Sequence, residues 1–424
     1  MTEVDSLVEH LFRRESGKLV SGLTRLFGPH NLDLAEDVVQ EVLLLALRRW
    51  PFDGIPRNPA GWLYQAARNK AVDMLRREQF VKRLEPHVRD ELAPAGATGP
   101  LVARLFLDGE IEDDTLRMMF TCCHPALPLE SQIALTLKIL CGFSAAEIGR
   151  ALLTQEAAIQ KRLSRARQKI REERIAFAVP PARELAPRLR AVLSVLYLTF
   201  NEGYSASFVA EPIRKDVCLE AMRLGALLTQ HPVGRAPPAF ALMALMCFHA
   251  ARFDARVDDD GHLVMLAHQD RSRWDRAFIA EGLRYLDGSA QGEEISEFHL
   301  EAGIAALHCQ AETWATTDWA GILRHYDLLM TLKPSPVVAL NRAIAIAELR
   351  GPPAGLEALR ELPAHPVMEA YHLLPATLGE LHFRLGELDE AARHFERAIT
   401  LTASRAERRH LEDKLRACRG GAPR

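Results

Sequence analysis

Apolar residues recur at helical spacing along almost the whole chain, and this pattern restricts the fold more than any other feature of the sequence. Leu34, Val38, Val42 and Leu45 illustrate it, because they return to one face at each turn of a helix. Runs of β-branched residues with a period of two, which would indicate strands, do not occur. The sequence therefore predicts an all-α protein.

Length, charge and cysteine content limit the classes of protein that fit. A chain of 424 residues with 48% hydrophobic residues is long enough for several domains with their own cores. The net charge of −3 gives no general sign of a nucleic-acid partner. An odd number of scattered cysteines, seven in all, fits a reducing compartment. Since no apolar run approaches the ~20 residues that a bilayer needs and no signal-peptide pattern is present, we expect a cytoplasmic protein without a membrane partner.

Changes in composition divide the chain into five predicted segments. They are a helical block at 5–83, a linker at 84–114, a second helical block at 115–178, a helical domain at 185–300 and helical repeats at 301–417. The linker is expected to be flexible because APAGATGP at 93–100 cannot hold a helix. Within the first block, PFDGIPRNP at 51–59 is expected to break the helix twice. The best repeat, at 378–399, has the small and large packing positions of a tetratricopeptide helix pair.

A helix-turn-helix pattern at 128–173 is the strongest functional signal. A first helix ends in a glycine turn, and a short helix then begins at Ser144 with Glu147 in a capping-box position. Thr154 is expected to cap the long basic helix that follows. This order of elements predicts a DNA-binding unit whose last helix is the recognition helix.

In that last helix, Ile159, Leu163, Ala166 and Ile170 recur at helical spacing and are expected to face the core. Local charge supports DNA binding by the rest of its surface. Between Arg150 and Arg171 there are seven Lys/Arg and one acid, a local charge of 7 − 1 = +6. Cations that neutralise phosphates release counterions and so favour binding, whereas a merely solvated helix gives no reason for charges of one sign. The candidate residues for this surface are Thr154, Gln160, Lys161, Arg162, Ser164, Arg165, Arg167 and Lys169.

A second basic helix, at 62–78, begins with aromatic residues. Between Gly61 and Arg83 there are six Lys/Arg and two acids, a local charge of 6 − 2 = +4. Aromatic rings beside cations suit unstacked bases; the alternative is an ordinary amphipathic helix with Trp62 in the core. The candidate residues are Trp62, Gln65, Arg68, Asn69, Asp73, Arg76 and Arg77.

A third helix, at 33–50, has a polar face that suits docking better than catalysis. Its candidate residues are Asp37, Gln40, Glu41, Leu44 and Arg48. Acid–base catalysis would need a pocket and a second partner, and neither is visible. The sequence also lacks the motifs GxxxxGK[ST], HExxH, GxSxG and GxGxxG. We therefore predict no catalytic residue, no cofactor and no enzyme.

Two stretches contain residues that could bind a ligand. FTCCHPAL at 120–127 carries Cys122 and Cys123, but a closed zinc set is missing. We predict that both cysteines pack in the core, at the hinge where the linker becomes the second block. A polar cluster around DDDGHL leaves a metal or sugar site open, although a solvated turn between helices is the favoured interpretation. Its residues are Asp254, Asp258, Asp259, Asp260 and Asp270, with Arg271, Arg273 and Trp274.

Three motifs in this order resemble a bacterial sigma factor of the sigma-70 family. They are AEDVVQEVLLLALRRW at 35–50, WLYQAARNKAVDMLRRE at 62–78 and LPLESQIALTLKILCGFSAAEIGRALLTQEAAIQKRLSRARQKI at 127–170. The chain is most similar to the extracytoplasmic-function type, which keeps only regions 2 and 4. The resemblance covers about residues 5–175, with Leu43 where family members usually have phenylalanine. The remainder resembles the tetratricopeptide-like extension of one subgroup.

The resemblance implies that the protein lends promoter specificity to core RNA polymerase. The helix at 33–50 would bind the β′ clamp helices, the helix at 62–78 would read and melt the −10 element, and the helix at 154–173 would read the −35 element. Region 4 would also contact the β flap, and the C-terminal extension would contact the sigma domains and regulate them. Two alternatives remain: a helix-turn-helix regulator with a ligand- or peptide-binding repeat domain, and a scaffold whose repeats bind peptides.

Overall fold

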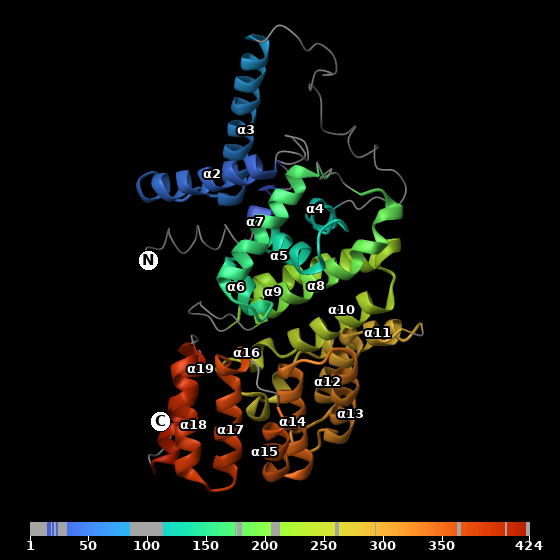
Figure 1. Ribbon diagram of the computed structural model, residues 1–424, viewed down its shortest axis with the longest axis vertical. Coiled ribbons are helices and arrows are strands. Elements are labelled where there is room, and N and C mark those ends of the chain that lie inside the picture. The colour runs from blue at the N-terminus through green and yellow to red at the C-terminus, as the bar shows by residue number, and fades with distance from the viewer. Residues whose placement is uncertain are drawn as a thin grey trace. The chain divides into compact units, whose positions relative to one another are not determined.

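The computed structural model describes residues 15–17, 19–20, 23, 32–84, 113–173, 175, 180–204, 213–258, 263–292, 294–362, 366–402 and 405–420. Over these residues it consists of α-helices and short 3-10 turns, and the only extended pairing is an isolated bridge between Val257 and Leu263 (Figure 1). The prediction of an all-α protein is confirmed. The chain forms two compact units, Met1–Val195 with His231–Val233, and Leu196–Gln230 with Gly234–Arg424.

Within the first unit, α2 (Leu32–Asp53) and α3 (Pro59–Leu84) form a pair of helices. The buried apolar face of α2 consists of Ala35, Val38, Val39, Val42, Leu43, Ala46 and Trp50. It meets a face of α3 on which Leu63, Ala67 and Ala71 are buried. The rings of Trp50 and Trp62 meet edge to face with their centroids 5.5 Å apart, which closes one end of the pair.

The loop between α2 and α3 is shorter than predicted. We expected residues 51–59 to break the helix, but α2 continues through Pro51 to Asp53. A proline in the last turn removes only one backbone hydrogen bond, which a helix end tolerates. The helix stops at Gly54, whose φ of +81° few other residues adopt. Asn58 then accepts a hydrogen bond from the Gly61 amide at 2.9 Å and caps α3.

Four further helices of the first unit follow, and the last three of them make the helix-turn-helix. The four are α4 (Asp114–Cys122), α5 (Leu129–Leu140), α6 (Ala145–Ala151) and α7 (Glu156–Glu172). The predicted capping box is present at α6: the Ser144 amide donates to Glu147 at 2.7 Å, and the Glu147 amide donates to the Ser144 hydroxyl at 3.2 Å. On α7, Ile159, Leu163 and Ala166 face the core, as the sequence periodicity predicts.

The start of α7 differs from the prediction, because Thr154 does not cap it. The N-cap residue is Gln155, whose side chain makes no capping hydrogen bond. Leu153 adopts a φ of +51°, and the Thr154 amide donates to the Gly149 carbonyl at 2.7 Å. Thr154 therefore belongs to the turn between α6 and α7. This turn is tight because Gly149 has no Cβ, which would lie only 2.8 Å from the Thr154 carbonyl oxygen.

The second unit contains helical hairpins. After the second half of α8 (Ala186–Tyr204), its helices are α9 (Lys215–Gln230), α10 (Pro237–Ala250), α11 (Arg276–Ser289), α12 (Glu297–Gln310), α13 (Trp319–Leu332), α14 (Pro336–Arg350), α15 (Pro352–Arg360), α16 (Pro366–Glu369), α17 (Leu373–Arg384), α18 (Leu388–Leu401) and α19 (Arg405–Cys418). The hairpin expected at 378–399 is formed by α17 and α18, which turn at Gly386 with a φ of +79°. No helix in the described part of the chain combines the length and apolarity needed to cross a membrane.

Candidate nucleic-acid interface

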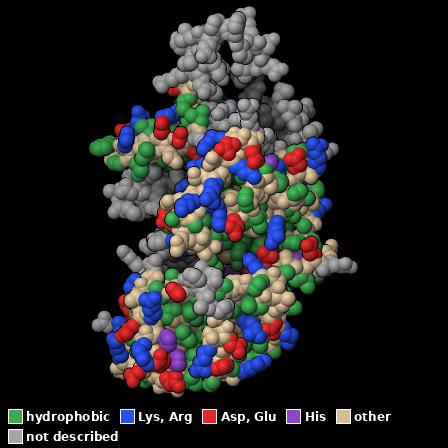
Figure 2. Space-filling view, in the orientation of Figure 1, with side chains coloured by type: hydrophobic (Ala, Val, Ile, Leu, Met, Phe, Trp, Pro, Cys, Tyr) green, Lys and Arg blue, Asp and Glu red, His purple; other side chains and the backbone are tan. Residues whose placement is uncertain are grey.

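The exposed face of α7 is the centre of the candidate interface. Figure 2 shows Lys and Arg side chains gathered over this helix. Gln160, Lys161, Ser164 and Arg165 are exposed on the side opposite the buried seam. Neither Lys161 nor Arg165 has an ion-pair partner among the described residues. These side chains can therefore reach the base edges and phosphates of a major groove, which is wide enough for a helix.

The remaining basic residues of α7 are engaged within the protein. Arg162 forms an ion pair with Glu130 of α5. Arg167 donates to Glu36 of α2 at 2.8 Å, and Lys169 lies 3.6 Å from Glu173. Thr154 is half-buried in the turn before the helix. Fewer residues of α7 are consequently available to contact DNA than the sequence predicted.

On α3, the predicted polar residues are exposed where the structure describes them. Gln65, Arg68, Asn69 and Asp73 all face solvent, and Gln65 donates to Asn69 at 3.0 Å. Trp62 is half-buried against Trp50, so it lies at the edge of the core rather than inside it. Arg76 and Arg77 lie in α3, but their side chains are outside the described residues.

Exposed apolar side chains lie beside this polar face. Phe52 is 88% exposed, Tyr64 is 52% exposed and Ile55 is 40% exposed. In the sequence, these three residues lie in or close to the connection between α2 and α3. Rings and apolar side chains that face solvent are surfaces on which an unstacked base can lie, so the local composition fits single-stranded nucleic acid.

On α2, all five predicted docking residues face solvent. Asp37, Gln40, Glu41 and Arg48 are exposed, and Leu44 among them is 51% exposed. The carboxylate of Glu41 forms an ion pair with Lys70 of α3. An exposed leucine ringed by charges is a small apolar contact with a polar rim, which is the composition of a protein–protein interface.

The two adjacent cysteines are core residues. Cys122 is the last residue of α4 and Cys123 is its C-cap, and both are buried. Burial raises the pKa of Cys123 to about 12 and raises that of Cys122 well above its usual value, so neither is a thiolate. Their predicted packing role fits this burial. The predicted hinge at this position does not fit the structure, because residues 120–127 join α4 to α5 inside the first unit.

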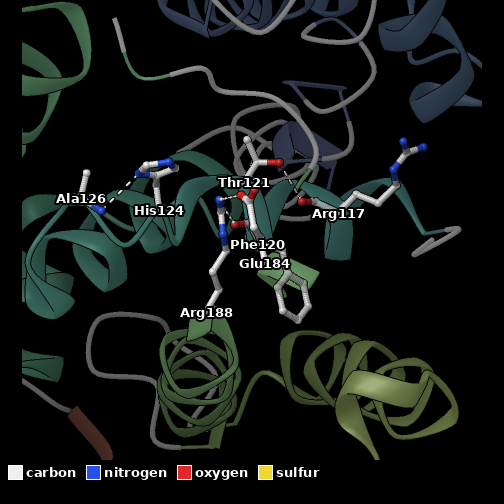
Figure 3. Close-up of polar contacts among 7 residues, drawn as sticks. All are labelled: Arg117, Phe120, Thr121, His124, Ala126, Glu184 and Arg188. Atoms are coloured by element: carbon white, nitrogen blue, oxygen red, sulfur yellow. Dashed lines mark hydrogen bonds and ion pairs between the residues drawn. The ribbon is translucent and has the colours of Figure 1, made fainter. Parts of the chain in front are cut away.

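Next to the cysteines, Arg188 of α8 reaches the end of α4 (Figure 3). Its side chain is buried, and its Nη1 donates to the Phe120 carbonyl at 2.9 Å while its Nη2 donates to Glu184 at 3.1 Å. Burial and this guanidinium also lower the pKa of the nearby His124. Arg188 was not among the residues predicted from the sequence, although its place at the start of the apolar run PRLRAVLSVLYL, which also holds Arg190, was a usable signal.

Replacing Arg188 by methionine is expected to destabilise the first unit by about 1–3 kcal/mol, because the Phe120 carbonyl loses its buried donor. The measurement is urea unfolding of the full chain, followed by the loss of helical signal. Arg190→Met is the matched control, because Arg190 is exposed on the same helix. Equal stabilities of the two variants would show that the Arg188 contact contributes nothing.

The aspartates around QDRSRWD serve mainly as helix caps and ion-pair partners. Asp270 accepts from the Ser272 amide, and Asp275 caps α11 through the amides of Ala277 and Phe278. Asp254 lies 2.5 Å from Lys215. In the described ranges, no group of three or more His, Cys, Asp or Glu could hold a metal; Asp259 and Asp260 lie outside those ranges.

The same motif is more deeply anchored than a solvated turn would be. Arg271 is buried and donates to the carbonyls of His308 and Ala311 at 2.6 and 2.7 Å. Trp274 is 2% exposed, with the Arg271 guanidinium 4.9 Å from its ring. The prediction of a solvated turn is therefore wrong for these two residues, which fasten the segment to the end of α12.

Comparison with known proteins divides the chain in a similar way. Residues 11–81 match sigma-70 region 2, residues 117–170 match sigma-70 region 4, and residues 188–290 match a family of unknown function, DUF6596. An uncharacterized protein of Rhizobium meliloti (strain 1021) is 38% identical over 396 residues, which are 93% of this chain and 92% of that protein. The probable RNA polymerase sigma factor RfaY of Xanthomonas campestris pv. campestris is 32% identical over 166 residues, 39% of this chain and 40% of that protein. The first two matched ranges contain the exposed faces of α2, α3 and α7.

Proposed function

We propose that the chain, whose residues 11–81 and 117–170 match regions 2 and 4 of the sigma-70 family, is an RNA polymerase sigma factor that binds core polymerase, recognises the −35 and −10 promoter elements and starts transcription. The observation that carries this proposal is that regions 2 and 4 both occur, in order, and that each presents an exposed polar face. Core RNA polymerase and promoter DNA are the partners that these regions imply.

The proposed division of labour assigns one exposed face to each partner. The α2 face with Leu44 docks on the β′ clamp helices of the polymerase, and region 4 also meets the β flap. The α3 face with Arg68 and Asn69 contacts the −10 element, where Phe52 and Tyr64 offer surfaces to unstacked bases. The α7 face with Lys161 and Arg165 reads the −35 element.

In this proposal the protein performs no chemistry of its own, because the polymerase makes the phosphodiester bonds. Two DNA-binding faces on one polymerase act together: once the first is bound, the second meets its element at high effective concentration. Neither face then needs high affinity by itself. A cytoplasmic location follows from the proposed partner.

We further propose that the protein is of the extracytoplasmic-function type and that the C-terminal extension, with tetratricopeptide-like repeats, regulates the sigma regions. Support comes from α8, in which the match to the family of unknown function begins at Arg188. That same side chain bonds to α4, next to the helix-turn-helix. A change in α8 thus has a direct route to region 4.

Run-off transcription tests the initiation function. Core polymerase, linear promoter DNA and this protein are expected to give a transcript with one defined start, whereas core polymerase alone gives none. A helix-turn-helix regulator or a peptide-binding scaffold would bind DNA or peptide but would not direct a start site. Absence of the transcript on promoters that the protein binds would contradict the proposal.

A truncation tests the regulatory part separately. A chain ending at Tyr204 keeps α8 and Arg188 with region 4 and loses the rest of the second unit. We expect its promoter-specific transcription to differ from that of the full chain by severalfold or more. Equal transcription by both chains, at equal helical content, would exclude regulation by the extension while leaving the initiation function intact.

A further inference from the structure

A cluster of basic and aromatic side chains lies inside the second unit, outside the sigma regions. Tyr204 at the end of α8 contacts His249 of α10, with ring centroids 4.9 Å apart. The guanidinium carbon of Arg256 lies 3.9 Å from the centre of the Tyr204 ring. Arg252 extends the cluster towards Trp274, at 5.5 Å from that ring. Three segments of the chain, around Tyr204, at 249–256 and around Trp274, thus bring hydrogen-bond donors into one region.

Several polar atoms of this cluster are buried without a hydrogen-bond partner among the described residues. They are the Tyr204 hydroxyl, His249 Nδ1, Arg256 Nε and Trp274 Nε1. Native proteins pair almost all buried polar groups, so a concentration of such atoms in one place calls for a reason. Three of the four can only donate or readily donate a hydrogen bond: an indole N–H, a guanidinium N–H and a phenol. The cluster is therefore suited to an acceptor.

The cluster also has an excess of positive charge. The Nε of Arg252 donates to the amide oxygen of Gln269 at 3.1 Å. The carboxylate of Glu407 acts on Arg256, whose charge helps to lower the pKa of Glu407, but Glu407 already lies 3.0 Å from His372. Asp254 is already paired with Lys215. Burial, and after it the charges of the two arginines, lower the pKa of His249 to about 3, so the imidazole is neutral.

We propose that Tyr204, His249, Arg252 and Arg256 form a binding site for a small oxyanion, the phosphate or carboxylate group of a metabolite. Guanidinium groups bind such oxyanions through paired N–H donors, and the phenol and the imidazole add neutral donors around them. A metal cation does not suit this site, because the two guanidinium groups would repel it and the hydrogen-bond donors could not act as its ligands. Arg256 is only half-buried, so the cluster borders solvent on its side.

The site goes beyond the proposed function, and its test measures binding rather than transcription. Inorganic phosphate and acetate are titrated separately into the full-length protein by calorimetry, with sodium chloride keeping the ionic strength constant. Saturable binding of one anion per chain is the expected result. Preference for phosphate would assign a phosphorylated ligand, and preference for acetate a carboxylate ligand. If neither phosphate nor acetate binds saturably, these donors are hydrogen-bonded only to water, and the proposal is overturned.

Variants locate the binding. Arg256→Gln is expected to raise the dissociation constant of the preferred anion at least tenfold, and Tyr204→Phe about threefold or more. Arg273→Gln is the matched control, because Arg273 is an exposed arginine in the neighbouring turn, and its dissociation constant should stay within twofold of the parent value. If Arg256→Gln does not fold, Tyr204→Phe decides, since it keeps the ring and removes only the unpartnered hydroxyl. An unchanged constant in Tyr204→Phe, or an equal loss in Arg273→Gln, would overturn the assignment.

Discussion

Replacing Arg165 by alanine is expected to weaken the binding of −35 promoter DNA by about tenfold. Arg165 is exposed on α7 and has no ion-pair partner in the part of the chain that the structure describes. Its guanidinium can therefore bind a guanine edge or a phosphate, and such a contact contributes about 1–3 kcal/mol. The measurement is fluorescence anisotropy of full-length protein with duplex DNA at several salt concentrations. If the contact is to a phosphate, the slope of log affinity against log salt should fall by about one.

Two further substitutions make this result specific. Arg162→Ala should weaken DNA binding less than Arg165→Ala, because Arg162 is held by Glu130. Asp37→Ala should leave the affinity for −35 DNA unchanged and should weaken binding to core polymerase, since Asp37 is exposed on α2. Equal losses of DNA affinity in Asp37→Ala and Arg165→Ala would contradict the assignment of separate faces to the two partners.

The sequence could identify the DNA-binding helix but could not rank its residues. Periodicity placed Ile159 and Leu163 in the core because their spacing is a local property of a helix. Pairing depends on contacts across the chain: the partner of Arg167 is Glu36, 131 positions away. A count of positive charges therefore included residues that the fold engages internally, and only the structure separates Arg165 from them.

Capping patterns in the sequence predicted the start of α6 correctly but not the start of α7. Ser144 and Glu147 form the predicted capping box because both of its hydrogen bonds close within four residues. Thr154 has the right side chain for a cap, yet Leu153 takes a left-handed conformation and moves the helix start to Glu156. That shift accompanies the close approach of the backbone of Gly149 to that of Thr154, five residues on, which the residue types of a capping pattern do not encode.

In the second unit, the sequence indicated helices but not the chemistry between them. The aspartates of QDRSRWD suggested a metal or sugar site, whereas Asp270 and Asp275 cap short and long helices. Arg271 and Trp274 are buried although their residue types are usually at least partly exposed. Burial of an arginine is possible here because carbonyls from a distant helix end accept its hydrogen bonds, and those acceptors cannot be identified from the motif itself.

Replacing Phe395 by alanine is expected to destabilise the α17–α19 part of the second unit by about 3–5 kcal/mol. Phe395 is 1% exposed and belongs to the cluster of Ala391, Ala398 and Leu411. Its ring also packs on Gly379 of α17, where an added Cβ would lie 2.8 Å from ring carbons. Three of its neighbours, Gly379, Ala391 and Ala398, are too small to fill the cavity that alanine would leave, so only part of the loss can be recovered.

Hydrogen exchange measured by mass spectrometry shows where this destabilisation acts. Amides of α17, α18 and α19 should exchange at least about 100-fold faster in Phe395→Ala, because their opening free energy falls with the lost packing. Amides of α4–α7 should be unchanged, since hairpins in such an array contact mainly their neighbours. Arg397→Ala is the control on the same helix, because Arg397 is exposed and should change stability by less than about 0.5 kcal/mol. Faster exchange in α4–α7 as well would show that the second unit stabilises the sigma regions, and the C-terminal hairpins would then control the fold of region 4 rather than act on it as a separate body.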